Sequence, residues 1–260
     1  MSPTSPAEQL LYLGRDFTRL NDAVTRLQLS PSTTATDVTA QAAAAQDLAR
    51  STLDFVHAQR TPRSPTSRTV CARMLDLAKL TNRASGHLLT ASDIIKHRHA
   101  GTPARGRPER RSRREALSTV DEGLAFVRDM SAFCAEEALK AAELLVAEQH
   151  RRGVITPQRS PALSLVQEAA MRAVALGQVT ICGGSPVVSQ ADIRVASSTI
   201  HALEARGFVA REDCVSWLSR ERAHLTADGC HALVAAIGRP RAAAQAAPSR
   251  SAAAVHRTAR

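Results

Sequence analysis

Apolar residues recur at alternating intervals of three and four positions in four long stretches of this sequence, and this spacing restricts the possible folds. The stretches cover residues 6–31, 36–59, 68–96 and 113–150. Such intervals place apolar residues on one face of a helix that packs against long partners. In the fourth stretch the predicted inward positions begin at Leu117 and end at Leu145. We therefore predict a mainly α fold, in which residues 1–150 form a four-helix, coiled-coil-like bundle.

The core of this bundle is expected to be aliphatic. Hydrophobic residues make up 44% of the chain and aromatic residues only 3%, which excludes wholesale disorder and is more typical of helix bundles than of sandwiches or barrels. The inward positions predicted in the first three stretches are Leu10, Leu13, Phe17, Leu20, Val24 and Leu27, then Val38, Ala42, Ala45, Leu48, Thr52 and Phe55, then Val70, Met74, Leu77, Thr81, Ala84, Leu88, Ala91 and Ile95. They are interpreted as structural core that carries no chemistry.

Positive charge is concentrated in two segments. The formal net charge is +10, of which residues 96–114 carry +7 and residues 239–260 carry +5, so the rest of the chain sums to −2. We expect the first segment to be a flexible loop and the second a disordered Ala/Arg tail, because neither has enough bulky apolar residues to bury. An anionic partner is one interpretation of this charge. Only three of the basic residues are Lys, and an Ala- and Arg-rich composition is also typical of a high-GC genome of the actinobacterial kind.

The basic loop at 96–114 has two interpretations that the sequence leaves equally open. It is either a nucleic-acid arm that makes nonspecific phosphate contacts or a solvated loop at the end of the bundle. No aromatic residue lies between its basic residues, so base stacking is not implied. The arginines assigned to the phosphate contacts are Arg105, Arg107, Arg110, Arg111, Arg113 and Arg114.

The five cysteines form no CxxC pair and no zinc-ligand spacing. We expect them to be reduced thiols of a cytoplasmic protein. The N-terminus shows no signal pattern, and no run approaches 18 apolar residues, so a soluble protein without a membrane partner is predicted. Common nucleotide-binding, hydrolase and metalloprotease motifs are missing, and we predict no enzymatic activity, no cofactor and no metal.

The last third of the chain combines helical and extended patterns. A helix is predicted over 162–177, followed by a short β-like run, QVTICGG, and by a helix that ends in ALEARGFV. An extended excursion over 208–226 and a last helix over 227–237 complete the pattern. We predict a linker at 151–161, so that a small α+β domain spans 162–238. This order resembles the winged helix-turn-helix of regulators of the multiple-antibiotic-resistance type.

The end of the predicted recognition helix carries the most specific part of this resemblance. Leu203, Arg206 and Gly207 match the Leu-x-x-Arg-Gly signature that ends such a helix. Gly207 suits a helix that turns directly into a strand, because glycine tolerates positive φ. The resemblance further implies that Ser197 or Ser198 caps the start of this helix.

The wing and the residues after it match the pattern in part. Leu225 is expected to enter the core, and Thr226 to cap the closing helix. Two features depart from the family. Only SQADIRVA is available for the helix that should precede the recognition helix, and the excursion contains the apolar Trp217 where a polar wing tip is usual.

The resemblance implies a transcription-regulator-like protein that binds DNA with this domain, while the bundle forms a homo-oligomer or holds a protein partner. The residues assigned to DNA are Gln190, Arg194, Ser198, Thr199, His201, Arg206, Arg211, Arg220 and Arg222. Residues 160–238 carry a net charge of −1, whereas DNA affinity comes largely from neutralised phosphates. The alternative is a non-enzymatic protein-interaction or scaffold protein whose winged helix docks protein. Arginines clustered on one face would favour DNA, and arginines on several faces would favour protein.

Overall fold

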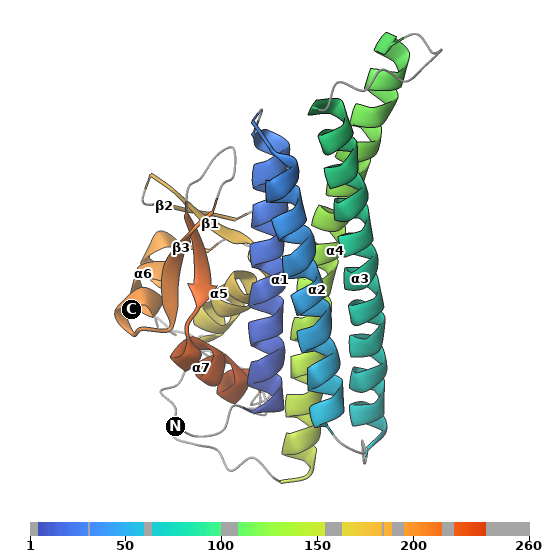
Figure 1. Cartoon of the computed structure of the whole chain (residues 1–260). Helices are drawn as coiled ribbons and strands as arrows, with labels where there is room; N and C mark the ends of the chain where they lie inside the picture. The colour runs from blue at the N-terminus through green and yellow to red at the C-terminus, as the bar shows by residue number, and fades with distance from the viewer. Residues whose placement is uncertain are drawn as a thin grey trace, which may run out of the picture.

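The structure of the chain is a computed structural model that describes residues 5–30, 32–59, 64–99, 109–153, 163–183, 185–188, 195–214 and 221–237. This part of the chain is mainly helical and contains a small antiparallel sheet, as predicted. Four long helices lie side by side, and the sheet with the shorter helices lies against one side of them (Figure 1).

The four long helices are α1 (Pro6–Leu29), α2 (Ala35–Ala58), α3 (Pro65–His99) and α4 (Glu109–Arg151). α1 and α2 begin at capping boxes, in which the side chains of Ser5 and Thr34 accept from the backbone of Glu8 and Asp37. The two carboxylates accept from the cap backbone in return, so amide groups that a first helical turn leaves without partners are satisfied. α1 packs along α4, α2 along α3, and α3 also along α4.

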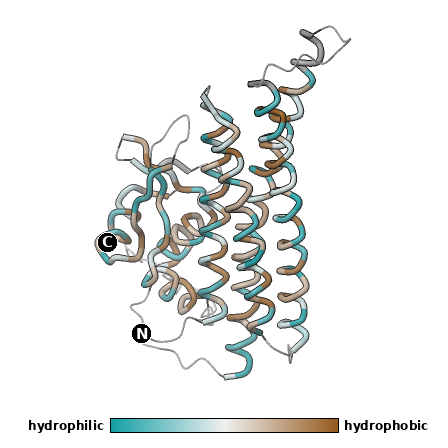
Figure 2. The backbone as a smooth tube through the Cα atoms, viewed as in Figure 1, coloured by the Kyte–Doolittle hydropathy of each residue, from teal (hydrophilic) through white to brown (hydrophobic). Residues whose placement is uncertain are grey.

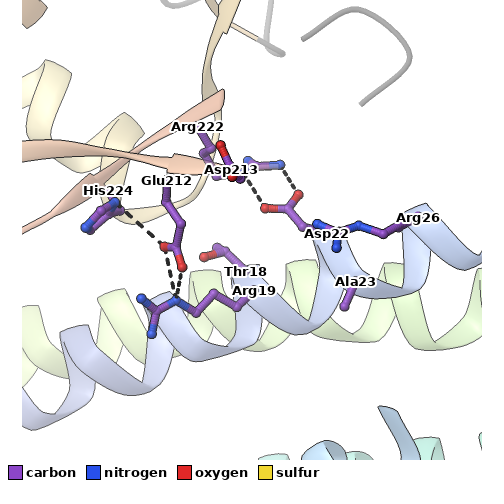
Figure 3. A pocket seen from close by; sticks show the side chains of 9 residues that line it. All are labelled: Thr18, Arg19, Asp22, Ala23, Arg26, Glu212, Asp213, Arg222 and His224. Carbon is purple, nitrogen blue, oxygen red and sulfur yellow. Dashed lines mark hydrogen bonds and ion pairs between the residues drawn. The ribbon is translucent and has the colours of Figure 1, made fainter. Parts of the chain in front are cut away.

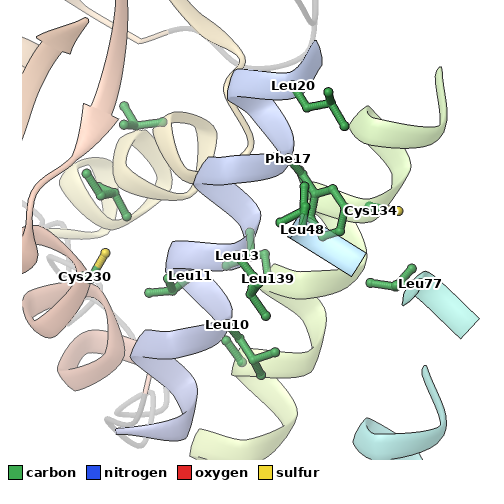
Figure 4. Packing of buried hydrophobic residues seen from close by; sticks show 14 of the residues in the cluster. Leu10, Leu11, Leu13, Phe17, Leu20, Leu48, Leu77, Cys134, Leu139 and Cys230 are labelled. Atoms are coloured by element: carbon green, nitrogen blue, oxygen red, sulfur yellow. The ribbon is translucent and has the colours of Figure 1, made fainter. Parts of the chain in front are cut away.

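The predicted apolar faces form the core between these helices. Figure 2 shows hydrophobic and hydrophilic stretches alternating along each of them. In Figure 4, Phe17 of α1 meets Leu48 of α2 and Cys134 of α4. Every predicted inward position is buried except Leu117, which is 39% exposed. The start of α4 extends past α1 and α2 (Figure 1), so this position has fewer helices to pack against.

In the C-terminal segment, residues 163–237, the described residues form the sheet and three short helices. Its elements are α5 (Leu165–Ala175), β1 (Val179–Cys182), β2 (Ser185–Val188), α6 (Ser197–Ala205), β3 (Val209–Asp213), β4 (Glu221–Leu225) and α7 (Ala227–Ile237). The strand order is β2-β1-β4-β3, and all neighbours are antiparallel. The sequence patterns do not predict β2, because its run SPVV is short and contains a proline. β2 is an edge strand, where a residue without an amide proton is tolerated.

The turn from α6 into β3 follows the sequence prediction. Gly207 has a φ of +70°, and the amide of Phe208 donates to the carbonyl oxygen of Leu203 at 3.0 Å. This bond closes the helix in the way that a left-handed glycine permits. After β4, the amide of Gly229 donates to Oγ1 of Thr226 at 3.0 Å, which confirms the predicted cap of α7.

The predicted cap of α6 is wrong. Ala196 occupies the cap position and makes no side-chain hydrogen bond to the helix. The helix begins at Ser197, so both serines lie in its first turn and neither precedes it. A cap residue has non-helical backbone angles, which let its side chain reach the first amides, whereas Ser197 and Ser198 are both within the helix.

Some predictions concern residues outside the described ranges. These are the helix expected before α6, the middle of the predicted basic loop (residues 100–108), the predicted linker from residue 154 onward, the wing tip with Trp217 and the Ala/Arg tail. At its two ends the predicted loop is wrong, because α3 continues to His99 and α4 begins at Glu109. The predicted first residues of the linker are described: α4 continues to Arg151, and a turn follows it.

The C-terminal segment approaches α1 closely at Gly177. The φ of this residue is +66°, and a Cβ placed there would lie 2.6 Å from Cγ2 of Thr18. Glycine therefore meets both a conformational and a steric requirement at this position. One apolar cluster continues from the long helices into α5, the sheet and α7. Leu11 of α1 and Cys230 of α7 face each other within it (Figure 4).

Candidate nucleic-acid interface and a charged junction

α6, the predicted recognition helix, lies on the side of the C-terminal segment that is remote from the long helices (Figure 1). Ile200 and Leu203 bury its inner face. Ser198 and His201 are exposed and Thr199 is half-buried. His201 is the one ionisable residue among those of α6 that the structure describes as exposed, so the outer face presents little charge.

Arg206, just after α6, packs against its own segment. Its guanidinium lies over the ring of Phe208, with Cζ 4.5 Å from the ring centroid. Nη1 also donates to Oε1 of Gln167 in α5 at 3.3 Å. The side chain therefore extends from the turn between α6 and β3 to α5.

Arg211 of β3 is held by two carboxylates. Its Nε donates to Oε1 of Glu204 at 2.7 Å, and Nη2 donates to the second oxygen at 3.2 Å. Nη1 contacts Glu221 of β4 at 3.4 Å. These hydrogen bonds raise the pKa of Arg211, and its charge is balanced within the segment.

Arg222 of β4 points toward Asp22 of α1 (Figure 3). Its Nε donates to one oxygen of Asp22 at 2.8 Å, and Nη2 is paired with the other oxygen. The two side chains are 16% and 15% exposed, so this is a largely buried ion pair. The structure thus places Arg206, Arg211 and Arg222 at three separate locations.

None of the remaining residues assigned to DNA or phosphate has a described side chain. Gln190, Arg194, Arg220, Arg105 and Arg107 lie outside the described ranges. The other four belong to the first turns of α4, where the backbone alone is described: Arg110, Arg111, Arg113 and Arg114.

A second stripe on α1 is the feature that the sequence patterns did not lead us to predict. It lies opposite the apolar face and consists of Glu8, Tyr12, Arg15, Arg19, Asp22 and Arg26. These residues follow one another at intervals of four and three, which is the same helical periodicity as that of the apolar face. The signal was therefore present in the sequence, but such a stripe of charges normally indicates a solvated helix face.

Two ion pairs and one histidine–carboxylate contact join this charged stripe to the C-terminal segment. Glu8 pairs with His231 of α7, where Oε1 lies 2.8 Å from Nδ1. Farther along α1, Nε of Arg19 donates to both oxygens of Glu212 in β3, at 2.8 and 3.1 Å. The pair of Asp22 and Arg222 completes the set. We call this contact of α1 with α7, β3 and β4 the charged junction.

The charged junction encloses a cleft of about 210 Å³. Its lining residues are Thr18, Arg19, Asp22, Ala23, Arg26, Glu212, Asp213, Arg222 and His224 (Figure 3). Three arginines and three carboxylates line this space, so their formal charges cancel. The cleft thus lacks the excess of one sign that would focus a charged ligand.

His224 of β4 has the least satisfied polar atom of the cleft. Its Nδ1 is buried without a hydrogen-bond partner, and Oε2 of Glu212 lies 3.7 Å away. Burial lowers the pKa of His224; Glu212 opposes this effect, and Arg15 and Arg19 add to it. Burial also raises the pKa of Asp22, although Arg222 acts to lower it. The charged forms of both groups are therefore disfavoured by their removal from water.

The cysteines and histidines form no metal site within the described ranges, where no three His, Cys, Asp or Glu side chains are arranged to hold an ion. Cys182 is exposed and the other four cysteines are buried. Burial raises the pKa of the Cys134 and Cys230 thiols to about 12, so both are protonated at neutral pH. Of the helices in the described residues, none combines the length and the apolar character needed to span a membrane.

A scan against protein-family models, a search of curated proteins and a search of solved structures each gave no match to this chain.

Proposed function

We propose that this chain is a non-enzymatic protein-interaction protein, in which a winged-helix-like domain is built onto a four-helix bundle. The observation that carries this proposal is that the arginines in the described part of the C-terminal segment are already paired. Each already has an acceptor in the same chain. The fourth of them, Arg172, pairs with Glu143 of α4 and Glu168 of α5.

The winged-helix interpretation is supported by topology. β1, β4 and β3 are neighbours in that order, and α6 leads through Gly207 into β3. The β1–β2 hairpin is an addition to that pattern. α7 packs on α1 and α4, and α5 packs on α1, so one face of the domain is already occupied by protein.

Electrostatics favours protein over DNA as the external partner. A phosphate would have to displace Glu204, Gln167 or Asp22 to reach the arginines that these groups hold. DNA affinity depends on cations that are free to replace counterions. The exposed outer face of α6 offers hydroxyl, methyl and imidazole groups instead, from Ser197, Ser198, His201, Ala202 and Ala205.

Site-specific photo-crosslinking tests the proposal. His201 would be replaced by p-benzoylphenylalanine in the native cell, with the same replacement at Ala44, an exposed position of α2, as the matched control. We expect the probe at His201 to give adducts that protease degrades and nuclease does not, and the control to give none. Nuclease-sensitive adducts at His201 would overturn the proposal in favour of DNA.

DNA binding is the second candidate, and the outward position of α6 favours it. A helix that reads bases must project from its domain, and α6 does so (Figure 1). Anisotropy with mixed duplex DNA at low salt would compare the wild type with a Ser198→Asp, His201→Glu variant. Loss of binding in this variant would support DNA reading by α6. Unchanged binding would assign any DNA affinity to other basic segments.

A further inference from the structure

The charged junction differs from an ordinary buried interface in holding two imidazoles, His224 and His231, that can gain a charge as the pH falls. These three contacts, of which two are ion pairs and one is the contact of His231 with Glu8, link α1 to α7, β3 and β4 across 193 to 223 residues of sequence. His224 lies beside them on β4, with one ring nitrogen buried and unpartnered. A histidine in such a position is the side chain best suited to respond to pH.

We propose that the charged junction is a proton-sensitive latch, in which protonation of His224 loosens the hold of β3 and β4 on α1. The inference goes beyond the proposed function, because it concerns how the C-terminal segment is retained on α1. It requires no ligand other than a proton.

The groups that face His224 make its protonation unfavourable in the closed arrangement. From α1, Arg15 and Arg19 oppose a third positive charge. From β3, Glu212 is the one carboxylate of the described residues that lies against the imidazole, and both of its oxygens are already bonded to Arg19. A protonated His224 would therefore compete with Arg19 for the same carboxylate.

Within the described ranges, the other elements packed on β4 bring no carboxylate within ion-pair distance of His224. On α5, Arg172 pairs with Glu168 and with Glu143 of α4. α7 directs His231 to Glu8 of α1. Separation of β3 and β4 from α1 would hydrate the imidazolium and move it away from both arginines, so protonation favours the open arrangement.

Hydrogen exchange measured by mass spectrometry on the full chain tests the latch. Protection would be compared at pH 7.5 and 5.5, after correction for the intrinsic rate of exchange. In the wild type we expect protection of β3, β4 and the facing part of α1 to fall severalfold at the lower pH, while α2 and α3 keep theirs. Equal protection at the two pH values would overturn the proposal without the need for any variant.

Two variants assign the effect to His224. His224→Gln keeps a polar side chain without a titratable ring, and we expect it to abolish the acid-induced loss of protection. His231→Gln, the matched control at the same junction, should retain the loss. The proposal would also be overturned if the acid-induced loss of protection persisted in the His224 variant, or if it disappeared in the His231 variant alone. Because these measurements involve neither DNA nor a protein partner, they test the latch independently of the proposed function.

Discussion

The two faces of α1 differ in how much they rely on charge, because the face toward the C-terminal segment adds ion pairs to the apolar contact of Leu11 with α7. On one face Leu10, Phe17 and Val24 are completely buried against the other long helices. On the opposite face Glu8, Arg19 and Asp22 bond to α7, β3 and β4. Apolar burial is insensitive to modest changes of salt and pH, whereas ion pairs respond to both. The comparison indicates that the long helices form the durable part of the molecule and the charged junction its adjustable part.

The largest effect is expected from truncating the apolar face. Phe17→Ala would remove a fully buried ring and lower the free energy of unfolding by about 3–5 kcal/mol. Urea denaturation followed by circular dichroism measures this. Leu165→Ala, at a side chain that is 72% exposed, serves as the control and should change stability by less than about 0.5 kcal/mol. Similar losses in both variants would contradict the assignment of the core.

The next largest effect concerns the close approach of the C-terminal segment to α1. Gly177→Ala places a methyl group against Thr18 at a positive φ. We expect about 1–2 kcal/mol from the left-handed conformation and about 1–3 kcal/mol more from the forced contact. At Gly207, φ is +70° and no atom crowds a new Cβ. Gly207→Ala should therefore lower the free energy of unfolding by only about 1–2 kcal/mol, which is the cost of the left-handed conformation. Equal losses would mean that the segment is not seated on Thr18.

A smaller loss is expected from breaking the largely buried pair of the charged junction. Asp22→Asn leaves the charge of Arg222 without a carboxylate in a site where both side chains are about 15% exposed. We expect a loss of about 1–3 kcal/mol. The control is Asp47→Asn, whose pair with Arg50 is 68% exposed on both sides and should contribute at most about 0.5 kcal/mol. A negligible change in the first variant would refute the junction.

The smallest effect is a pH dependence of stability. The pKa of His224 is lowered from 6.5 in the folded state, so below that value the unfolded state binds the proton more readily. The free energy of unfolding should therefore decrease as pH falls through 6.5 and stay constant above it with respect to this group. Urea titrations from pH 8 to pH 5 measure the slope, and His224→Gln should flatten it. An unchanged slope in the variant would assign it to other groups.

The helices of this protein were predictable because their signals are local. Pro6, Gly207 and Thr226 mark helix ends through backbone chemistry that involves only near neighbours. The spacing of apolar residues gave the buried face of each long helix, and it failed only at Leu117, near the free end of α4. β2 was missed, since pairing with β1 rather than residue preference forms it.

The candidate site was predictable only as a set of residue types. The arginines after α6 fit a DNA-binding pattern, but their partners come from α1, α5, α6 and β4, which the pattern does not specify. Glu204 and Glu221 lie within eleven residues of Arg211, yet only the fold brings them to it. Charge counts along the sequence therefore overestimate the cations that are free to bind phosphate.

The sequence by itself determined the long helices, their apolar faces and the turn at Gly207, because helix periodicity and backbone conformation are properties of neighbouring residues. The tertiary structure alone decided that a charged stripe of α1 is an interface and that Arg222 faces inward. Asp22 and Arg222 are 200 residues apart, and no local pattern encodes which distant partner will neutralise a surface charge.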